Sequence, residues 1–225
     1  MKLEILGVGS GFSPELGNSS FLIWNNDETS AVLMDCGSLV FGKLRELEMK
    51  QNRDIISKID TIFISHTHMD HSGSLGTLMQ YHKWICQKHA KLAGVSVRSL
   101  LDATLMENTN AYPITVNKEI EIIPTRHGDG PAVAGFYDGV LYSGDSAKSL
   151  LNTPQAKKAH TIIHEVSTVS NDAHIGIEDL AEAPAEIRAK TWLTHYTSSA
   201  KEPLKIKATA YGFAGLLKQG QVLQR

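Results

Sequence analysis

Short apolar segments separated by turn residues dominate the N-terminal part of the chain. The pattern predicts strands, because each segment is rich in apolar residues and is bounded by Gly, Asn, Asp or Ser. These strands are Lys2–Gly7, Ser20–Trp24, Ala31–Met34 and 61–65. Helical spacing appears in two places: residues 41–50 put Leu44 and Leu47 on one face, and a second helix is predicted to begin near Ser72 and to carry Met79.

After mixed structure between residues 90 and 112, the strand pattern returns. Strands are predicted at 119–123, 132–137, Val140–Tyr142, 161–164 and Thr191–Thr194, with a strand pair around 216–223. Asp138-Gly139 is a strong signal for a tight hairpin turn, and one helix is expected near 177–189. Strands outnumber helices and the helices are interspersed among them. The chain is therefore expected to have an α/β (α+β) fold in which helical layers cover sheets.

Composition narrows the class of protein. The 225 residues suit a single domain, 1–225, with a substantial core. The 22 Lys and Arg residues are balanced by 24 Asp and Glu, so no overall positive field would attract nucleic acid or an anionic membrane. Only two cysteines and no long apolar N-terminal segment predict a cytoplasmic protein, and no apolar run is long enough to cross a bilayer.

Residues 66–71, His-Thr-His-Met-Asp-His, concentrate the chemistry of the chain directly after a predicted strand. Side-chain direction alternates along a strand, so His66 and His68 are expected to point the same way and to bind one metal ion. Asp70 and His71, on the following turn, are expected to face a second ion or the water between two ions. The alternative is a surface histidine cluster, which gives no packing reason for crowding imidazoles at a strand end.

Three further residues lie where a predicted strand gives way to a loop: His127, Asp145 and His195. Sheet-based enzymes gather functional groups at such positions, because the sheet fixes the site and the loops leave room for ligand. Asp145, preceded by a glycine, is a candidate carboxylate bridge between two ions. Alone, each residue would be better explained as a hydrogen-bonded His or a turn Asp. Together with residues 66–71 they favour a dinuclear metal site.

The HTHMDH segment, the later lone His127, the YSGD segment and the LTH segment occur in the order found in the metallo-β-lactamase superfamily, which the chain resembles over nearly its whole length. The resemblance implies a four-layer αββα sandwich with two divalent metal ions at one edge, Zn²⁺ or alternatively Mn²⁺ or Fe²⁺. The implied ligands are His66, His68 and His127 for one ion, Asp70, His71 and His195 for the other, and Asp145 as the bridge. Asp35 matches a position that supports the ligands by hydrogen bonding.

A second pair of motifs indicates one branch of that superfamily. His164-Glu165-Val166-Ser167, followed by His174-Ile175-Gly176, resembles the HEAT and HST motifs of the phosphodiesterases that include the tRNA 3′-end processing ribonuclease Z. The resemblance implies that His174 contacts the phosphate and protonates the leaving oxygen, while Glu165 orients it. Two cations would polarise the phosphate and generate a hydroxide from water, and Asp70 would orient that hydroxide or accept the proton that the water loses. The alternative is an ordinary strand end followed by a polar loop, with Val-Ser and Ile-Gly marking the departure from the motifs.

The expected substrate is a small phosphodiester. Long-chain tRNA-processing relatives carry an inserted arm that grips the tRNA, in bacterial-type members between the third histidine motif and the bridging aspartate, whereas only a short hairpin separates His127 from Asp145 here. The net charge also provides no basic surface for a large RNA. Among compact relatives the chain most resembles phosphodiesterases that open 3′,5′-cyclic nucleotides such as cCMP and cUMP to nucleoside monophosphates, including phage anti-Pycsar enzymes. Such relatives are commonly homodimers, and residues 100–112 are a candidate partner-facing segment.

Three other functions stay open. A tRNA 3′-end processing endonuclease would need a partner to supply the missing grip. A lactonase or thioesterase of the same fold would attack a carbonyl and would leave Glu165 and His174 without a purpose. A non-catalytic binding module would be expected to have lost some of the seven ligands, and none is missing.

Other polar residues have simpler interpretations. His82 and His89 are expected on a solvated or half-buried helix face rather than at a metal. Gly9-Ser10-Gly11 could present backbone N–H groups to a phosphate, and a tight turn explains it equally well. Asn18-Ser19-Ser20 are candidates for the lining of the pocket.

Overall fold

The N-terminal part of the chain forms a six-stranded sheet. In spatial order its strands are β12 (Val222–Gln224), β1 (Lys2–Gly7), β2 (Ser20–Trp24), β3 (Ala31–Met34), β4 (Ile59–Ile64) and β5 (Lys91–Gly94). The pairs β1–β2 and β2–β3 are antiparallel, whereas β3, β4 and β5 are parallel. Strands β2 and β3 are buried along their whole length, which explains their continuous apolar sequences. This computed structural model describes residues 1–95, 119–128 and 130–224.

A second six-stranded sheet comes from the C-terminal part. Its spatial order is β11 (Gly215–Leu216), β10 (Thr191–Thr194), β9 (Thr161–Glu165), β8 (Val140–Tyr142), β7 (Gly130–Tyr137) and β6 (Glu121–His127). Strands β8 to β11 are parallel, and β6 and β7 are antiparallel to their neighbours. In the turn between β7 and β8, Asp138 and Gly139 have φ values of 46° and 72°, as the Asp-Gly pair predicted.

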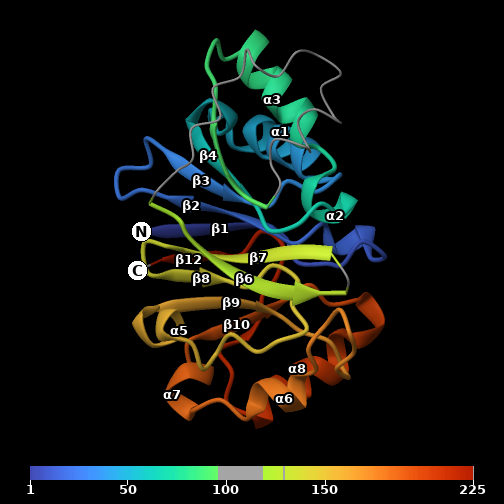
Figure 1. Cartoon of the computed structure of the whole chain (residues 1–225). Helices are drawn as coiled ribbons and strands as arrows, with labels where there is room; N and C mark the ends of the chain where they lie inside the picture. Colours follow the sequence, from blue (N-terminus) through green and yellow to red (C-terminus); the bar gives the residue numbers. More distant parts are fainter. Residues whose placement is uncertain (96–118, 129, 225) are drawn as a thin grey trace.

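Helices cover the outer face of each sheet (Figure 1). Over the first sheet lie α1 (Val40–Gln51) and α3 (Leu75–Trp84), with the short α2 (Met69–Ser72) at its edge. Under the second lie α5 (Pro154–Lys158), α6 (Ile177–Ala181), α7 (Ala185–Arg188) and α8 (Lys201–Ala210). Single 3-10 turns occupy Pro14–Leu16, Ile56–Lys58 and Ser198–Ala200. The αββα sandwich implied by the resemblance is confirmed.

Two apolar clusters hold these layers together. One joins the facing sides of the two sheets and continues to the C-terminal helices, as the contacts of Phe63, Tyr142 and Leu204 show. The other packs α1 and α3 on the outer face of the first sheet, through residues such as Leu44 and Leu78. Both sheets are therefore rigid platforms for the loops at their edges. In the described part of the chain, no helix is long and apolar enough to span a bilayer.

Two predictions for the C-terminal part are wrong. The helix expected over 177–189 is two helices, because Pro184 is the N-cap residue directly before α7 and disfavours helical geometry in the residue before it. The strands expected to pair around 216–223 lie in different sheets: β11 pairs with β10, and β12 pairs with β1. The sequence of a short strand does not indicate which strand it will pair with. Here β11 and β12 each form the edge strand of a different sheet. Helix α8 was not predicted, and the partner-facing segment 100–112 lies outside the described residues.

The prediction that His82 lies on a solvated or half-buried face is also wrong. His82 lies in helix α3 with its ring fully buried, and its Nε2–H donates to the carbonyl of Ile56 at 2.8 Å. A helix can bury a histidine where a carbonyl satisfies its one N–H, which periodicity alone does not reveal. Burial lowers the pKa of His82 to about 4, so the folded protein keeps this ring neutral at neutral pH.

This buried ring makes the stability of the protein depend on pH. Between the unfolded pKa of about 6.5 and the folded pKa of about 4, only the unfolded chain protonates His82, so the free energy of unfolding falls as the pH drops through this window. We expect His82→Gln, whose amide can still donate to Ile56, to remove this contribution, on the order of 2 to 3 kcal/mol between pH 7 and pH 4.5. Urea unfolding of both proteins at the two pH values measures it, and an equal loss in both would contradict the prediction.

Candidate functional site

The ends of several strands meet at one edge of the sandwich, where they place all of the residues predicted to bind metal. The first sheet contributes residues that follow β4 or lie in α2: His66, His68, Asp70 and His71. The second sheet contributes residues at the ends of β6, β8, β9 and β10: His127, Asp145, Glu165 and His195. His127 is the last residue of its strand rather than a loop residue. His174 comes from the loop after β9.

The ligand atoms of these side chains form compact groups in which all atoms lie within 4.8 Å of one another. The groups are His66 with His68 and His127; Asp70 with His71 and His195; His66 with His71 and Asp145; and Asp145 with Glu165, His174 and His195. The first two are the two ligand sets that the resemblance implied. Segments far apart in the sequence therefore converge on one place.

The Asp145 carboxylate lies between these two sets and turns one oxygen toward each. Oδ1 is 3.2 Å from Nε2 of His71 and 3.3 Å from Nε2 of His195. Oδ2 is 3.8 Å from Nε2 of His66 and also 3.8 Å from Nε2 of His127. This division of the two oxygens is the arrangement expected of a carboxylate that can bridge two cations.

Asp35 lies behind the imidazoles as a fully buried carboxylate on which four donors converge. Oδ1 accepts from the backbone N–H of Ser65 at 2.7 Å. Oδ2 accepts from the Ser65 hydroxyl at 2.7 Å, from Nδ1 of His71 at 2.7 Å and from the Tyr142 hydroxyl at 2.8 Å. His71 is thereby oriented with Nε2 toward the site. Sequence analysis missed Ser65 and Tyr142, which adjoin the histidine and YSGD motifs and give no separate signal.

Gly144 allows the chain to pass close behind this arrangement. Its φ is +55°, and a Cβ there would lie 2.4 Å from Cβ of Ser65. Any other residue would be strained in this backbone conformation and would also clash. The glycine before Asp145 is therefore required for the position of that carboxylate.

His127 and His66 are each held by one ring nitrogen, so that the other faces the site. Nδ1–H of His127 donates to the carbonyl of Ala173 at 2.8 Å, and Nδ1 of His66 lies 3.1 Å from the hydroxyl of Ser65. His68 is oriented the other way, with Nδ1 3.1 Å from Nε2 of His127. Two ring nitrogens at this distance need a proton or a cation between them. The protein thus selects tautomers that direct lone pairs toward a common centre.

Buried atoms without partners support a metal at this edge. Among the described residues, His66 Nε2, His71 Nε2 and Asp145 Oδ1 are buried and make no hydrogen bond. Buried polar atoms are nearly always paired, so three together indicate a missing partner. Imidazole nitrogen and carboxylate oxygen are ligands of Zn²⁺ and of neighbouring divalent cations. The residues fit bound divalent metal.

Electrostatics at the site favour the same conclusion. Burial lowers the pKa of His66 to about 2, with repulsion from His71 adding to the effect, so its ring keeps a free lone pair at neutral pH. Burial opposes ionisation of Asp145, but His195 and His71 outweigh it and lower its pKa. Burial, followed by the charge of Asp145, raises the pKa of Glu165 well above its usual value. An ionised Asp145 beside a neutral His66 supplies the donors that a divalent cation requires.

Glu165 and His174 form a hydrogen-bonded pair beside Asp145. Oε2 of Glu165 is 2.7 Å from Nδ1 of His174, and Oε1 accepts from the backbone N–H of Ser146. Oδ1 of Asn171 accepts from the backbone N–H of His174 at 2.9 Å and fixes the loop. Because Nδ1 is occupied, Nε2 of this half-buried imidazole is left for a ligand. The structure thus brings together the pair suggested by the second motif.

These groups open into a cleft of about 860 Å³. The cleft is lined by Ser10, Gly11, Phe12, Pro14, Asn18, Ser38, Leu39, His68, Met69, Asp70, His127, Asp145, Glu165, Val166, Ser167, Thr168, Ala173, His174, His195, Tyr196, Thr197 and Ala200. None of these lining residues is Lys or Arg. Of the three residues predicted to line the pocket, Asn18 does so, whereas Ser19 and Ser20 are buried and are not among the lining residues. The exposed apolar residues Phe12, Leu39 and Met69 were not predicted, because single loop positions carry no periodic signal.

Comparison with known proteins agrees with this geometry. A family model described as Anti-Pycsar protein Apyc1 matches residues 1–97 and 91–223. The chain belongs to this family. The Anti-Pycsar protein Apyc1 of Bacillus phage 010DV004 is 32% identical over 240 residues, which cover 87% of this chain and 89% of the relative. That of Paenibacillus sp. (strain J14) is 25% identical over 226 residues, which cover 88% of this chain and 89% of the relative.

A solved structure supports the fold. The metallo-β-lactamase fold protein YhfI from Bacillus subtilis has a TM-score of 0.76 with this chain, at 20% identity, and the match covers 99% of this chain and 98% of that protein. Family membership, fold and the clustered ligands together identify the chain as a hydrolase of the metallo-β-lactamase fold.

The hydrogen bonds to Asp35 lead to a test of metal affinity. We expect Asp35→Asn to weaken binding of Zn²⁺ or Mn²⁺ by about 10- to 100-fold, because an amide cannot accept all four bonds and leaves His71 poorly oriented. Calorimetric titration of the metal-depleted protein measures the affinity. Asp60→Asn, which changes a half-exposed carboxylate paired with Lys88, serves as the matched control. Equal affinities of the Asp35 and Asp60 variants, with circular dichroism showing both folded, would contradict the expectation.

Proposed function

We propose that this hydrolase is a metal-dependent phosphodiesterase that opens 3′,5′-cyclic nucleotides, above all cyclic pyrimidine nucleotides such as cCMP and cUMP, to nucleoside monophosphates. The observation that carries the proposal is the 2.7 Å hydrogen bond between Glu165 and His174, located beside the carboxylate that joins the two imidazole groups. A phosphodiester needs both halves of this arrangement: an electrophilic centre for its phosphate and an acid for its leaving oxygen.

The first half is the metal-binding edge. We assign one divalent cation, Zn²⁺ or Mn²⁺, to His66, His68 and His127 and a second to Asp70, His71 and His195, with Asp145 shared. Bound there, the cations would polarise the phosphate and lower the pKa of a water molecule. Asp70 is half-buried, with Oδ2 3.2 Å from Nε2 of His195, and lines the cleft. It is therefore positioned to orient the attacking water and to accept its proton.

The second half is the leaving-group side. Attack of water on phosphorus forms one P–O bond and breaks the P–O bond to a ribose oxygen, which must then take up a proton. We assign this proton to Nε2 of His174, because Nδ1 is held by Glu165. Glu165 keeps the ring in place and is itself fixed by Ser146 and by burial. A positioned acid of this kind typically contributes about 10²- to 10⁴-fold to the rate.

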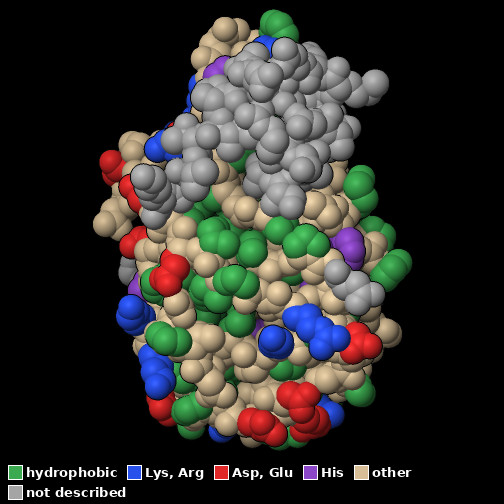
Figure 2. Space-filling view, viewed as in Figure 1, with side chains coloured by type: hydrophobic (Ala, Val, Ile, Leu, Met, Phe, Trp, Pro, Cys, Tyr) green, Lys and Arg blue, Asp and Glu red, His purple; other side chains and the backbone are tan. Residues whose placement is uncertain are grey.

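The cleft favours a small substrate over a large RNA. Among the described residues that line it there is no Lys or Arg, so this part of the wall would not hold a series of backbone phosphates. Between β6 and β8 the described chain contains only the β7 strand and its tight turn, with no arm. On the face seen in Figure 2, the described Lys and Arg side chains lie close to Asp and Glu rather than in one basic patch. A cyclic mononucleotide, with a single phosphate, suits these surroundings.

A substrate panel tests the proposal. Metal-loaded protein is incubated with cCMP, cUMP, cAMP, cGMP and a tRNA precursor, with Asp70→Ala as control. Metal-dependent opening of the cyclic nucleotides, fastest for the pyrimidines and absent in the control, is the expected result. Cleavage of the precursor alone would replace the proposal with RNA processing. Inactivity on all five would leave lactones and thioesters as the next substrates.

The role of His174 is tested by changing the leaving group. We expect His174→Ala to lower kcat for cyclic nucleotides by about 10²- to 10⁴-fold. The loss should be much smaller with bis(4-nitrophenyl) phosphate, because nitrophenolate leaves without needing a proton. His160→Ala, a histidine outside the cleft, is the matched control. An equal loss on both substrates would mean that His174 positions the phosphate or the metal instead of donating a proton.

A further inference from the structure

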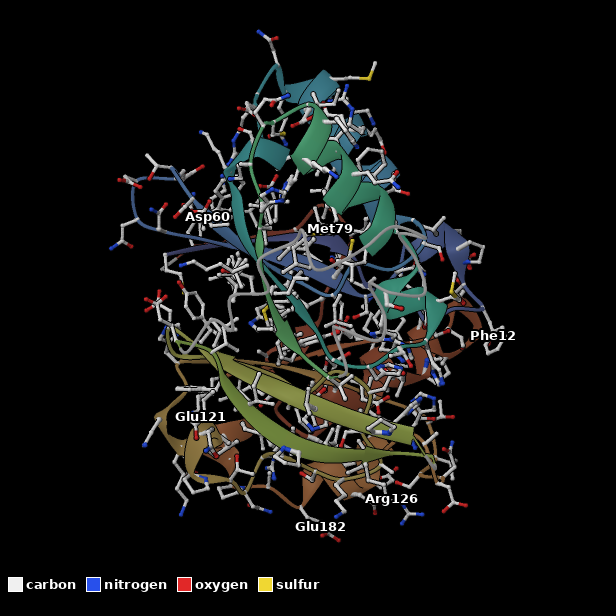
Figure 3. The ribbon with its side chains drawn as sticks, turned by 45° about the horizontal axis from the view of Figure 1, so that its top comes forward. Phe12, Asp60, Met79, Glu121, Arg126 and Glu182 are labelled. Carbon is white, nitrogen blue, oxygen red and sulfur yellow. The ribbon has the colours of Figure 1, made fainter. Side chains whose placement is uncertain are left out.

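One wall of the cleft has no role in the chemistry described above. It consists of residues 10–12 of the N-terminal loop, all of which line the cleft. Phe12 is 95% exposed, and Figure 3 shows its side chain projecting at the edge of the molecule. A large aromatic side chain left almost wholly in water at the mouth of a binding cleft points to a function in ligand contact.

The loop that carries Phe12 is held in place on both sides. Gly9 N–H donates to the carbonyl of Gly17 at 2.8 Å, and Ser13 N–H donates to the carbonyl of Ser10 at 3.1 Å. The hydroxyl of Ser13 then accepts from the backbone N–H of Ser198 at 3.2 Å. These bonds confirm the tight-turn interpretation of this segment. The same hydrogen bonds fix the backbone of the loop that carries the exposed Phe12 ring.

The loop passes directly against the metal-binding edge. A Cβ added to Gly11 would lie 3.1 Å from Cγ and 3.2 Å from Oδ2 of Asp70. Phe12 is the next residue, and consecutive Cα atoms are about 3.8 Å apart. A phosphate bound beside Asp70 would therefore have the Phe12 side chain within reach of the groups attached to it.

Ser10 provides an independent observation on the same loop. Its hydroxyl is buried and has no hydrogen-bond partner among the described residues, although the residue lines the cleft and is 8% exposed. An unpaired buried hydroxyl is costly, and a ligand atom can supply the missing partner. Leu39 and Met69 also line the cleft and are 42% and 66% exposed, so its lining includes exposed apolar side chains besides Phe12.

We propose that residues 10–12 form the nucleoside subsite of this enzyme, in which Phe12 stacks on the nucleobase and the Ser10 hydroxyl hydrogen-bonds to a polar atom of the nucleoside. The inference rests on the proposed function and adds the residues that bind the part of the substrate remote from phosphorus. Stacking is tolerant of base identity, since every base has a π face. Phe12 therefore contributes affinity for all cyclic nucleotides, and Gly11 keeps the loop close to Asp70.

The test compares a substrate that has a base with one that lacks it. We expect Phe12→Ala to raise KM for cCMP about tenfold with kcat within about twofold of wild type, and Phe12→Tyr to restore KM. Phe12→Leu, apolar but not aromatic, should fall between them. Propane-1,3-diol cyclic phosphate keeps the six-membered phosphodiester ring without ribose or base, so its kcat/KM should be the same in all four proteins. Ser10→Ala should raise KM for cCMP severalfold.

Ile206→Ala is the matched control, because this residue is 69% exposed on α8 and does not line the cleft. A KM for cCMP that is unchanged in Phe12→Ala, or an equal loss on the base-free phosphate, would overturn the subsite while leaving the phosphodiesterase intact. A change in sedimentation of Phe12→Ala with unaltered KM would likewise overturn it, by assigning the ring to contact between copies of the chain. Wild-type protein that is inert toward every cyclic nucleotide would overturn the proposed function itself.

Discussion

Asp35 places a fully buried carboxylate between the two sheets, and four hydrogen bonds converge on it. Three come from Ser65 and His71, which follow β4 in the first sheet, and one comes from Tyr142 in β8 of the second. A buried charge is tolerated only when it is paired and hydrogen-bonded. The same bonds therefore make the charge acceptable, join the sheets at their functional edge and set the direction of an imidazole.

Every other feature of the site depends on that junction. Once the sheets are joined, β4 and β8 end side by side, and Asp145 can turn one oxygen toward each group of imidazoles. The ring nitrogen of His127 that faces away from the site donates to the carbonyl of Ala173. Nε2 of His66 and Nε2 of His71 are left without protein partners among the described residues, which is unfavourable in the absence of a ligand and favourable when a cation binds.

The two halves of the chain contribute different parts of the cleft. The first sheet supplies His66, His68, Asp70 and His71, together with the exposed apolar rim near Phe12. The second supplies the Asp145 carboxylate, the Glu165–His174 pair and the strand end that carries His195. Each of the two proposed ligand sets, His66 with His68 and His127 and Asp70 with His71 and His195, takes residues from both sheets. Under the proposed function, a cyclic nucleotide bound between the sheets would place its phosphate at the metal ligands, its leaving oxygen at His174 and its base at the apolar wall.

The sequence alone indicated most of the strands, because their apolar runs are local, although it missed β5 and placed β6 too early, at 119–123. It also indicated the ligand types, because three imidazoles and a carboxylate within residues 66–71 have little other use. The resemblance to a known family added the prediction that the sheets and helices form an αββα sandwich. Only the tertiary structure decided which edge β11 and β12 join, that His82 is buried, and that Ser65 and Tyr142 bind Asp35. Those outcomes depend on contacts between residues distant in the chain, and local patterns carry no information about which distant partner a side chain will meet.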